Sequence, residues 1–175
     1  MTKPLPLKTA FAEGALIVRS SCGKLIDGLQ VRLAKVIPDE RGRLGEIMRA
    51  DDPWFEKFGQ VYFTTTYPGV VKAWHYHKKQ TDYFYVAKGM IKAAFYDERK
   101  DSPTFGAVNE VYLGEHCPGL IRVPAGVHHG WMCVSTDEAY IINIPNETYD
   151  YSNPDEYRTA AHGSHIPYDW TRKDG

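Results

Sequence analysis

Residues 69–89 read GVVKAWHYHKKQTDYFYVAKG, and this stretch decides the fold class of the chain. Its first part, residues 70–77, is rich in β-branched and aromatic residues, which favours a β-strand. His75 and His77 stand two positions apart, and a strand directs such residues to the same face. We therefore expect both imidazoles to point into one cavity of a β protein, with Asp82 as an acidic candidate shortly after them.

Similar short runs of apolar or alternating residues, each bounded by turn residues, recur along the chain. This pattern predicts an antiparallel barrel or sandwich. The expected strands are 15–18, 29–37, 60–65, 70–77, 83–87, 91–96, 108–113, 120–123, 131–134 and 139–144. Lys88-Gly89 between two of them is typical of a hairpin turn, because glycine readily takes a positive φ. Helix signals are confined to residues 51–58 and 154–161, where we expect a turn or two each.

The composition is that of an ordinary globular domain. The chain has 175 residues and a formal net charge of −1, with no basic stripe, which argues against a nucleic-acid partner. Its apolar runs are far too short to cross a bilayer, and residues 1–6 carry no apolar signal core. Three widely spaced cysteines suit neither disulfides nor a zinc–thiolate site. We expect one cytoplasmic domain over residues 1–175, with its barrel core at about 30–145 and a tail at 146–175.

A second histidine-bearing stretch, residues 124–129, reads PAGVHH and lies far from the first. The spacing of glycine, histidine and aspartate within residues 69–89 resembles the first cupin motif, although aspartate stands where glutamate is usual. Residues 124–129 resemble the second cupin motif and place His129 at its histidine position, while Cys133 stands where that motif has asparagine. The resemblance implies an all-β fold: a cupin-type antiparallel barrel, or jelly roll, with one or two short helices.

A single histidine in a pocket is most often a hydrogen-bonded wall residue. Two histidines on one strand face, joined by a third from a remote loop, favour a functional cluster, since unpaired buried polar groups are costly. The polar-lining interpretation stays open beside the functional one.

Four stretches resemble landmarks of the dTDP-4-dehydrorhamnose 3,5-epimerase family, in the family's order. They are DERGRLGE at 39–46, GVVKAWH at 69–75, DERKDSPTFG at 97–106 and PAGVHHGW at 124–131. The SPTFG string is the most distinctive of them. The resemblance implies a sugar-nucleotide isomerase that acts on a nucleoside-diphosphate 4-keto-6-deoxyhexose. Such an enzyme removes a proton next to the keto group and returns one to the opposite face.

By position, His75 matches the family's base and His129 its second pocket histidine. A histidine suits the role of base because its ordinary pKa lies near neutral pH. Arg41 and Glu46 match residues that hold the nucleotide, commonly across a dimer interface, and we expect a homodimer. The remaining candidates for substrate contact are Gln60, Lys72, His77, Asp82 and His128.

Three positions depart from the family pattern. Lys72 replaces an arginine, and Asp82 replaces a lysine that helps to hold the substrate oxygen. The second exchange turns an attraction to the substrate oxygen into a repulsion, unless Asp82 is paired. At about 4 Å and an effective dielectric of about 20, such an interaction is worth roughly 4 kcal/mol. Ile142 aligns with the family's acid tyrosine, so Tyr140, two residues earlier, is the candidate acid. Further candidates are Tyr149 and Tyr151 for the acid, and Asp169 and Asp174 for the carboxylate that orients the base.

These departures leave two alternatives open beside the cofactor-free isomerase. One is a metal-binding cupin, because three imidazoles and a carboxylate form a reasonable ligand set for one divalent metal ion. Its ligands would be His75, His77, Asp82 and His129. The other is a sugar-nucleotide binding protein without turnover, favoured by the missing lysine and tyrosine. For the isomerase we expect a small-molecule sugar nucleotide as partner, and no cofactor, nucleic acid or membrane.

Overall fold

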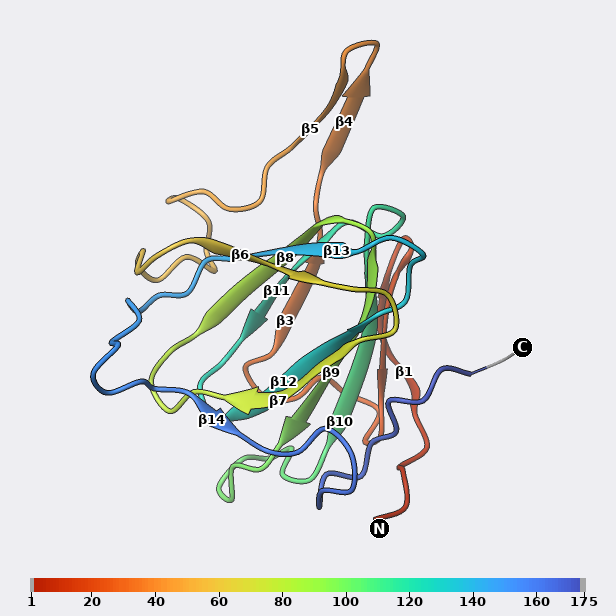
Figure 1. Cartoon of the computed structure of the whole chain (residues 1–175), viewed down its shortest axis with the longest axis vertical. Helices are drawn as coiled ribbons and strands as arrows, with labels where there is room; N and C mark the ends of the chain where they lie inside the picture. The colour runs from red at the N-terminus through yellow and green to blue at the C-terminus, as the bar shows by residue number, and fades with distance from the viewer. Residues whose placement is uncertain (1, 174–175) are drawn as a thin grey trace.

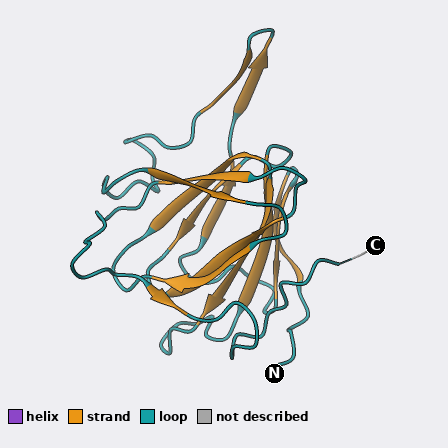
Figure 2. Ribbon diagram, viewed as in Figure 1, coloured by secondary structure: helices purple, strands orange, loops and turns teal. Residues whose placement is uncertain are grey.

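The computed structural model describes residues 2–173, which form fourteen β-strands and no helix (Figures 1 and 2). The larger sheet has seven strands, in the order β1 (Lys8–Glu13), β2 (Leu16–Ser20), β10 (Val108–Gly114), β9 (Met90–Asp97), β12 (Val127–Cys133), β7 (Val71–Tyr76) and β14 (Tyr157–Arg158). The smaller sheet has five, in the order β3 (Gln30–Leu33), β11 (Gly119–Val123), β8 (Asp82–Lys88), β13 (Ala139–Asn143) and β6 (Tyr62–Thr66). This antiparallel jelly roll confirms the expected cupin-type fold.

The core fills the space between the two sheets, because alternate residues of each strand point inward. Phe95 and Leu113 of the larger sheet join Phe84 and Ile141 of the smaller sheet in one buried cluster. The ring centroids of Phe84 and Phe95 lie 6.2 Å apart. Burying one such side chain stabilises the fold by roughly 1.5–3 kcal/mol, so this cluster holds the two sheets together. Among the described residues we find no helix with the length and apolar character that a bilayer crossing needs.

The C-terminal segment packs over the outer face of the larger sheet. Trp170 is 1% exposed, and its ring centroid lies 4.9 Å from that of Trp74 on β7. Tyr168 packs edge-on against the same indole and donates a hydrogen bond of 2.6 Å to the carboxylate of Glu110. The tail therefore supports, from behind, the strand that carries His75.

A hairpin of β4 (Val36–Asp39) and β5 (Gly42–Gly45) projects from the barrel, at the top of Figure 1. Its tight turn uses Gly42, whose φ of +140° lies in the range that favours glycine. Ile37 and Leu44 on this hairpin are 51% and 61% exposed. The hairpin thus presents apolar side chains that residues 2–173 do not cover.

The expected helix at residues 51–58 is not present. Only isolated turns form there. The Asp52 carboxylate accepts a hydrogen bond of 3.0 Å from the backbone N–H of Trp54 and pairs with Arg32. Such a local bond from side chain to backbone competes with helix continuation.

The expected helix at residues 154–161 is also wrong. Tyr157–Arg158 forms β14, which pairs with the edge strand β7. Next to it, Thr159 and Trp74 exchange two backbone hydrogen bonds of 3.0 Å. An open sheet edge offers hydrogen bonds to any nearby extended segment, and here that tertiary pairing overrides the local helix signal.

Other boundaries differ from expectation as well. Residues 29–37 form two strands, β3 and β4, and the short or exposed strands β1, β5 and β14 carry no clear pattern. Because β1, β2 and β14 belong to the larger sheet, the barrel extends beyond residues 30–145 at both ends. Lys88-Gly89 is not a hairpin turn, since it joins β8 to β9 in the other sheet. Gly89 does take a positive φ, of 71°.

Candidate functional site

A cavity of about 790 Å³ opens between the two sheets. Lys72 and His75 of β7 line one wall, and Tyr62 and Thr64 of β6 line another. The C-terminal segment adds Arg158 to the rim, because β14 is paired in register with His75. Residues from the two sheets and from the tail therefore face the same space.

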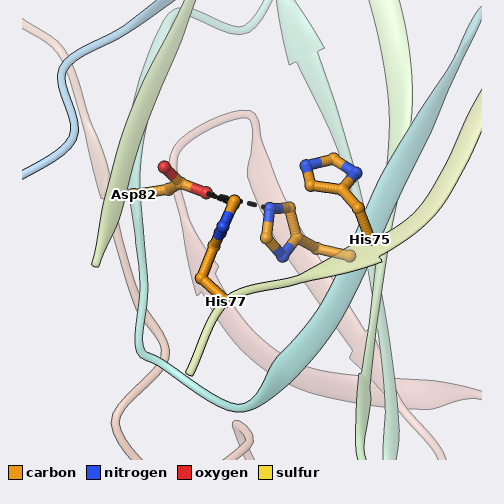
Figure 3. Close-up of side chains that lie close together, drawn as sticks. His75, His77 and Asp82 are labelled. Carbon is orange, nitrogen blue, oxygen red and sulfur yellow. Dashed lines mark ion pairs between the residues drawn. The ribbon is translucent and has the colours of Figure 1, made fainter. Parts of the chain in front are cut away.

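Four side chains meet beside this cavity, and Figure 3 labels His75, His77 and Asp82 among them. The fourth is His129, and the ligand-type atoms of all four lie within 4.8 Å of one another. β7 supplies His75 and leads into His77, β8 begins with Asp82, and β12 supplies His129. His75 and His129 are direct partners in the β7–β12 register, and their ring centroids lie 4.0 Å apart.

Asp82 is the centre of the cluster and is 1% exposed. Its Oδ1 accepts hydrogen bonds from the side-chain amides of Gln80 at 2.8 Å and Asn143 at 2.9 Å. Its Oδ2 lies 3.1 Å from Nε2 of His77 and 3.1 Å from Nε2 of His129. Burial alone would raise the pKa of Asp82, but its contacts with His129 and His77 outweigh burial and hold that pKa well below 3.8. The carboxylate is therefore ionised.

The far nitrogens of both histidines are tied to backbone carbonyls. Nδ1 of His77 lies 2.5 Å from the carbonyl oxygen of Asp155, and Nδ1 of His129 lies 3.0 Å from that of Val127. A carbonyl oxygen only accepts hydrogen bonds, so each Nδ1 carries the proton. This arrangement fixes both rings and turns both Nε2 atoms toward Asp82. Burial lowers the pKa of His77, but the adjacent Asp82 carboxylate outweighs burial and raises it.

His75 differs from its two neighbours because no described residue forms a hydrogen bond or ion pair with its ring. It packs edge-on against His129 and Trp131, with ring centroids 4.0 and 5.9 Å away. Burial and the adjacent His129 lower the pKa of His75 well below 6.5, although Asp82 opposes this. The ring is therefore neutral at pH 7 and has a nitrogen free to accept a proton.

The opposite wall carries a tyrosine linked to the same cluster. Tyr62 accepts a hydrogen bond of 2.9 Å from Nδ2 of Asn143, the amide that also donates to Asp82. Burial and the nearby charge of Asp82 raise the pKa of Tyr62 to about 12. The phenol therefore keeps its proton at neutral pH.

Comparison with known proteins supplies the family. A model of the dTDP-4-dehydrorhamnose 3,5-epimerase family matches residues 24–174. The chain belongs to this family. It is therefore an enzyme of the epimerase type, which confirms the expected enzyme class and speaks against a binding protein without turnover.

Two curated relatives of this epimerase-family chain match most of its length. It is 41% identical over 146 residues to a probable low-salt glycan biosynthesis epimerase of Haloferax volcanii, with 82% of this chain and 89% of the relative covered. It is 36% identical over 146 residues to a spore coat polysaccharide biosynthesis protein of Bacillus subtilis strain 168, with 83% and 97% covered. A solved dTDP sugar isomerase from Desulfovibrio desulfuricans G20 superimposes with a TM-score of 0.80 at 31% identity, covering 85% of this chain and 94% of that one.

Of the expected substrate contacts, Gln60 and Lys72 line the cavity of this epimerase-family member together with His77. The Lys72 ammonium donates to the Thr64 hydroxyl at 2.9 Å and to the Thr65 carbonyl at 2.6 Å, so it bridges β7 and β6. Lys72 is therefore an exposed lining residue whose ammonium is held beside β6.

His128 lies on the other face of the sheet from His129, because successive strand residues point in opposite directions. Its ring packs against Tyr76 with a centroid distance of 4.3 Å, and its Nε2 lies 3.4 Å from a carboxylate oxygen of Glu98. Burial lowers the pKa of His128 to about 4. The structure does not bring this residue to the cavity.

Tyr140 also points away from the cavity. On β13, Ala139, Ile141 and Asn143 are buried on the inner face, so Tyr140 and Ile142 face outward. The Tyr140 hydroxyl donates to Glu138 at 2.9 Å. Tyr149 and Tyr151 do line the cavity, with Tyr151 90% exposed.

The remaining expected residues lie elsewhere. Arg41 and Glu46 are exposed on or beside the projecting hairpin, where they pair with Asp39 and Arg49, and neither lines the cavity of its own chain. Asp169 is exposed and accepts a hydrogen bond from the backbone of Thr171. Asp174 lies outside the described residues.

Sequence reasoning missed four residues that shape the site. Tyr62 and Asn143 share a register position on paired strands that are far apart in sequence. Asp155 accepts backbone hydrogen bonds from Lys78, Lys79 and Gln80 and so holds the loop after His77. Arg158 reaches the rim only through the unexpected strand β14. No local pattern signals these positions, since each depends on long-range pairing.

Proposed function

We propose that this chain epimerises a nucleoside-diphosphate 4-keto-6-deoxyhexose, with His75 as the base that removes the proton next to the keto group. The observation that carries the proposal is the contrast among the three clustered histidines. His77 and His129 are held by Asp82 and by backbone carbonyls, whereas His75 lines the cavity with a ring that no described residue engages. A sugar nucleotide suits a cavity of about 790 Å³, within the usual range for small-molecule sites.

The relatives support the substrate class. Two of them are named for glycan or polysaccharide biosynthesis, and a structural neighbour is named a dTDP sugar isomerase. The charge reversal at Asp82 is compatible with an enolate, because two imidazoles protonated on both nitrogens would offset the carboxylate that they face. The Lys72 and Arg158 side chains at the rim are suited to the diphosphate.

The test is solvent deuterium exchange into 4-keto-6-deoxyhexoses carried by dTDP, UDP, GDP and CDP. We expect wild type to exchange the proton next to the keto group in one of them. His75→Ala is expected to lower that exchange by about 10²–10⁴-fold, the usual contribution of a positioned base. His116→Ala, an exposed histidine outside the cavity, is the matched control. Equal exchange by wild type and His75→Ala would remove His75 from this role.

A second candidate, metal-assisted isomerisation, is favoured by the orientation of the two tied imidazoles. With Nδ1 protonated, a neutral ring presents a lone pair at Nε2, yet both Nε2 atoms face the ionised Oδ2 of Asp82. That oxygen accepts no hydrogen bond of ordinary geometry from the described residues. Two protonated rings or one bound cation would each resolve the repulsion.

The distances fit a metal ion. Donors that each lie about 2.1 Å from one ion, at roughly 90–109° to each other, stand about 3.0–3.4 Å apart. The two N···O separations of 3.1 Å lie in this range. Gln80 and Asn143 on Oδ1, and the carbonyls on each Nδ1, would hold these ligands in place. A divalent ion held by His77, Asp82 and His129, with His75 beside it, would polarise the substrate's keto oxygen.

Elemental analysis separates the two candidates. Protein purified without a metal-chelate column is expected to carry one ion per chain if the second candidate holds, and Asp82→Ala and His77→Ala are expected to lose it. A metal content far below one ion per chain, in protein with full exchange activity, would rule out the metal-assisted candidate. Only the cofactor-free epimerase would then remain.

A further inference from the structure

An epimerase needs a proton donor on the face of the sugar opposite its base, and the sequence resemblance places Ile142 at the position of the family's acid tyrosine. Ile142 and the nearby Tyr140 both face outward from β13, away from the cavity. The cavity wall opposite β7 is formed by β6, which contributes Tyr62 and Thr64. The base and any donor on β6 thus come from different sheets.

Tyr62 is held by strand pairing as well as by a hydrogen bond. Tyr62 and Asn143 are direct partners in the β6–β13 register, with both side chains on the inner face. Inner positions alternate along both strands, since Thr66 lies opposite the buried Ala139. The phenol is therefore aimed into the barrel interior, and its 42% exposure includes the cavity that it lines.

The orientation of Asn143 settles which partner donates. Its Nδ2 lies 2.9 Å from the Tyr62 hydroxyl and 2.9 Å from Oδ1 of Asp82. The reverse amide orientation would place a carbonyl oxygen against an ionised carboxylate, so Asp82 fixes the NH₂ group between them. One hydrogen of the Asn143 amide is donated to the Tyr62 hydroxyl oxygen, and the other is donated to Oδ1 of Asp82. The Tyr62 oxygen accepts, and its own proton has no acceptor among the described residues, which leaves that proton for a ligand.

We propose that Tyr62 is the catalytic acid that delivers a proton to the face of the sugar opposite His75, an inference that rests on the epimerase function proposed above. His75 takes the proton from the carbon next to the keto group, and the C–H electron pair forms the enolate. Tyr62 then gives its O–H proton to the same carbon from the other side, which re-forms the ketone and leaves a tyrosinate. The imidazolium loses its proton to water and the tyrosinate takes one from water, so protons and charge balance. The Asn143 amide stabilises the tyrosinate by donating to its oxygen.

The test compares two readouts on dTDP-4-keto-6-deoxyglucose in deuterated water, with products trapped by borohydride reduction. In Tyr62→Phe, His75 and the enolate remain, so deuterium exchange at the reacting carbon is expected to stay within about threefold of wild type. Formation of the inverted sugar is expected to fall at least about 100-fold, because the donor on that face is gone. Tyr62→Phe removes only one hydroxyl, so we expect the variant to fold. Its thermal unfolding and its binding of dTDP check this.

Tyr67→Phe is the matched control, because Tyr67 follows the same strand, is 69% exposed and does not line the cavity. It is expected to match wild type in both readouts. The proposal is overturned if Tyr62→Phe inverts the sugar at the wild-type rate, if it loses exchange and inversion together, or if Tyr140→Phe rather than Tyr62→Phe blocks inversion. Absence of both readouts in wild type, with every nucleotide in the panel, would instead reject the proposed function, and the role of Tyr62 with it.

Discussion

The sequence resemblance places Asp82 at a lysine position of the family, and the surroundings of Asp82 explain how a buried carboxylate is tolerated there. Two amide donors hold Oδ1, and two imidazoles face Oδ2. A buried ion pair costs much desolvation energy, so such a pair persists only when its remaining hydrogen-bonding groups are satisfied. At this site the exchange of one residue has therefore been accommodated by a whole shell of neighbours.

Asp82→Asn tests that shell. The substitution keeps the shape of the side chain but removes its charge. The new amide faces two imidazoles and two amide donors that contact a carboxylate in wild type. We expect a loss of about 3–5 kcal/mol in the free energy of unfolding, as when one partner of a buried pair is removed. Urea denaturation measures it, with the exposed Asp101→Asn as control. An unchanged denaturation midpoint would mean that the charge of Asp82 adds nothing to the free energy of unfolding.

At the scale of elements, the SPTFG string at residues 102–106 forms part of a turn. It joins β9 to β10, and Asp97, at the end of β9, is its anchor. The Asp97 carboxylate accepts hydrogen bonds from Arg99 at 2.8 Å, Ser102 at 2.5 Å and Thr104 at 2.6 Å. Asp97 also pairs with Val127 at the start of β12, the strand that carries His129. The most distinctive family string thus fixes a strand end and does not line the cavity.

This turn gives a pH dependence of stability. Burial alone would raise the pKa of Asp97, but hydrogen bonds from Arg99, Ser102 and Thr104 outweigh burial and lower it to about 2. The folded pKa lies below the ordinary value of 3.8, so the stabilisation is complete above about pH 4 and is lost as pH falls toward 2. A shift of this size corresponds to about 2 kcal/mol.

Denaturation curves at pH 5 and pH 2 for wild type and Asp97→Asn provide the measurement. Wild type is expected to lose about 2 kcal/mol more than the variant over this interval, because only wild type carries the titrating group. Equal losses would show that another group governs the acid transition.

At the scale of the whole molecule, the two residues that we expect to hold the nucleotide lie outside the cavity of this chain. The sequence resemblance predicts that Arg41 and Glu46 hold the nucleotide, but both lie on or beside the projecting hairpin, away from their own cavity. The hairpin also exposes Ile37 and Leu44. We propose that the chain forms a homodimer in which this hairpin reaches the cavity of the second copy. A symmetric interface of this kind would supply both cavities alike.

Mixing two inactive variants tests the dimer. We expect Arg41→Ala and His75→Ala to be weak alone, whereas in refolded mixtures about a quarter of the sites would regain both residues. Activity should recover in proportion, and the mass in solution should be about twice the 19.9 kDa of one chain. A monomeric mass, or a mixture no more active than its components, would place Arg41 outside the substrate site.

Much of this architecture was predictable from local patterns. Alternation and turn residues locate eleven of the fourteen strands, in whole or in part, because a half-buried strand must alternate. The cluster of His75, His77, Asp82 and His129 follows from two motifs with fixed spacing, and the structure brings all four together. The helix signals at 51–58 and 154–161 failed because local propensity is weak beside side-chain pairing or an open sheet edge.

The sequence by itself determined the barrel, the family and the histidine face, since these depend on periods of two residues and on short motifs. Only the tertiary structure decided that Tyr62 rather than Tyr140 faces the cavity, that Asp155 holds His77, and that Arg158 reaches the rim. Each of these depends on which distant strands pair and in which register. A shift of one residue in register reverses every side chain, and no local pattern encodes that choice.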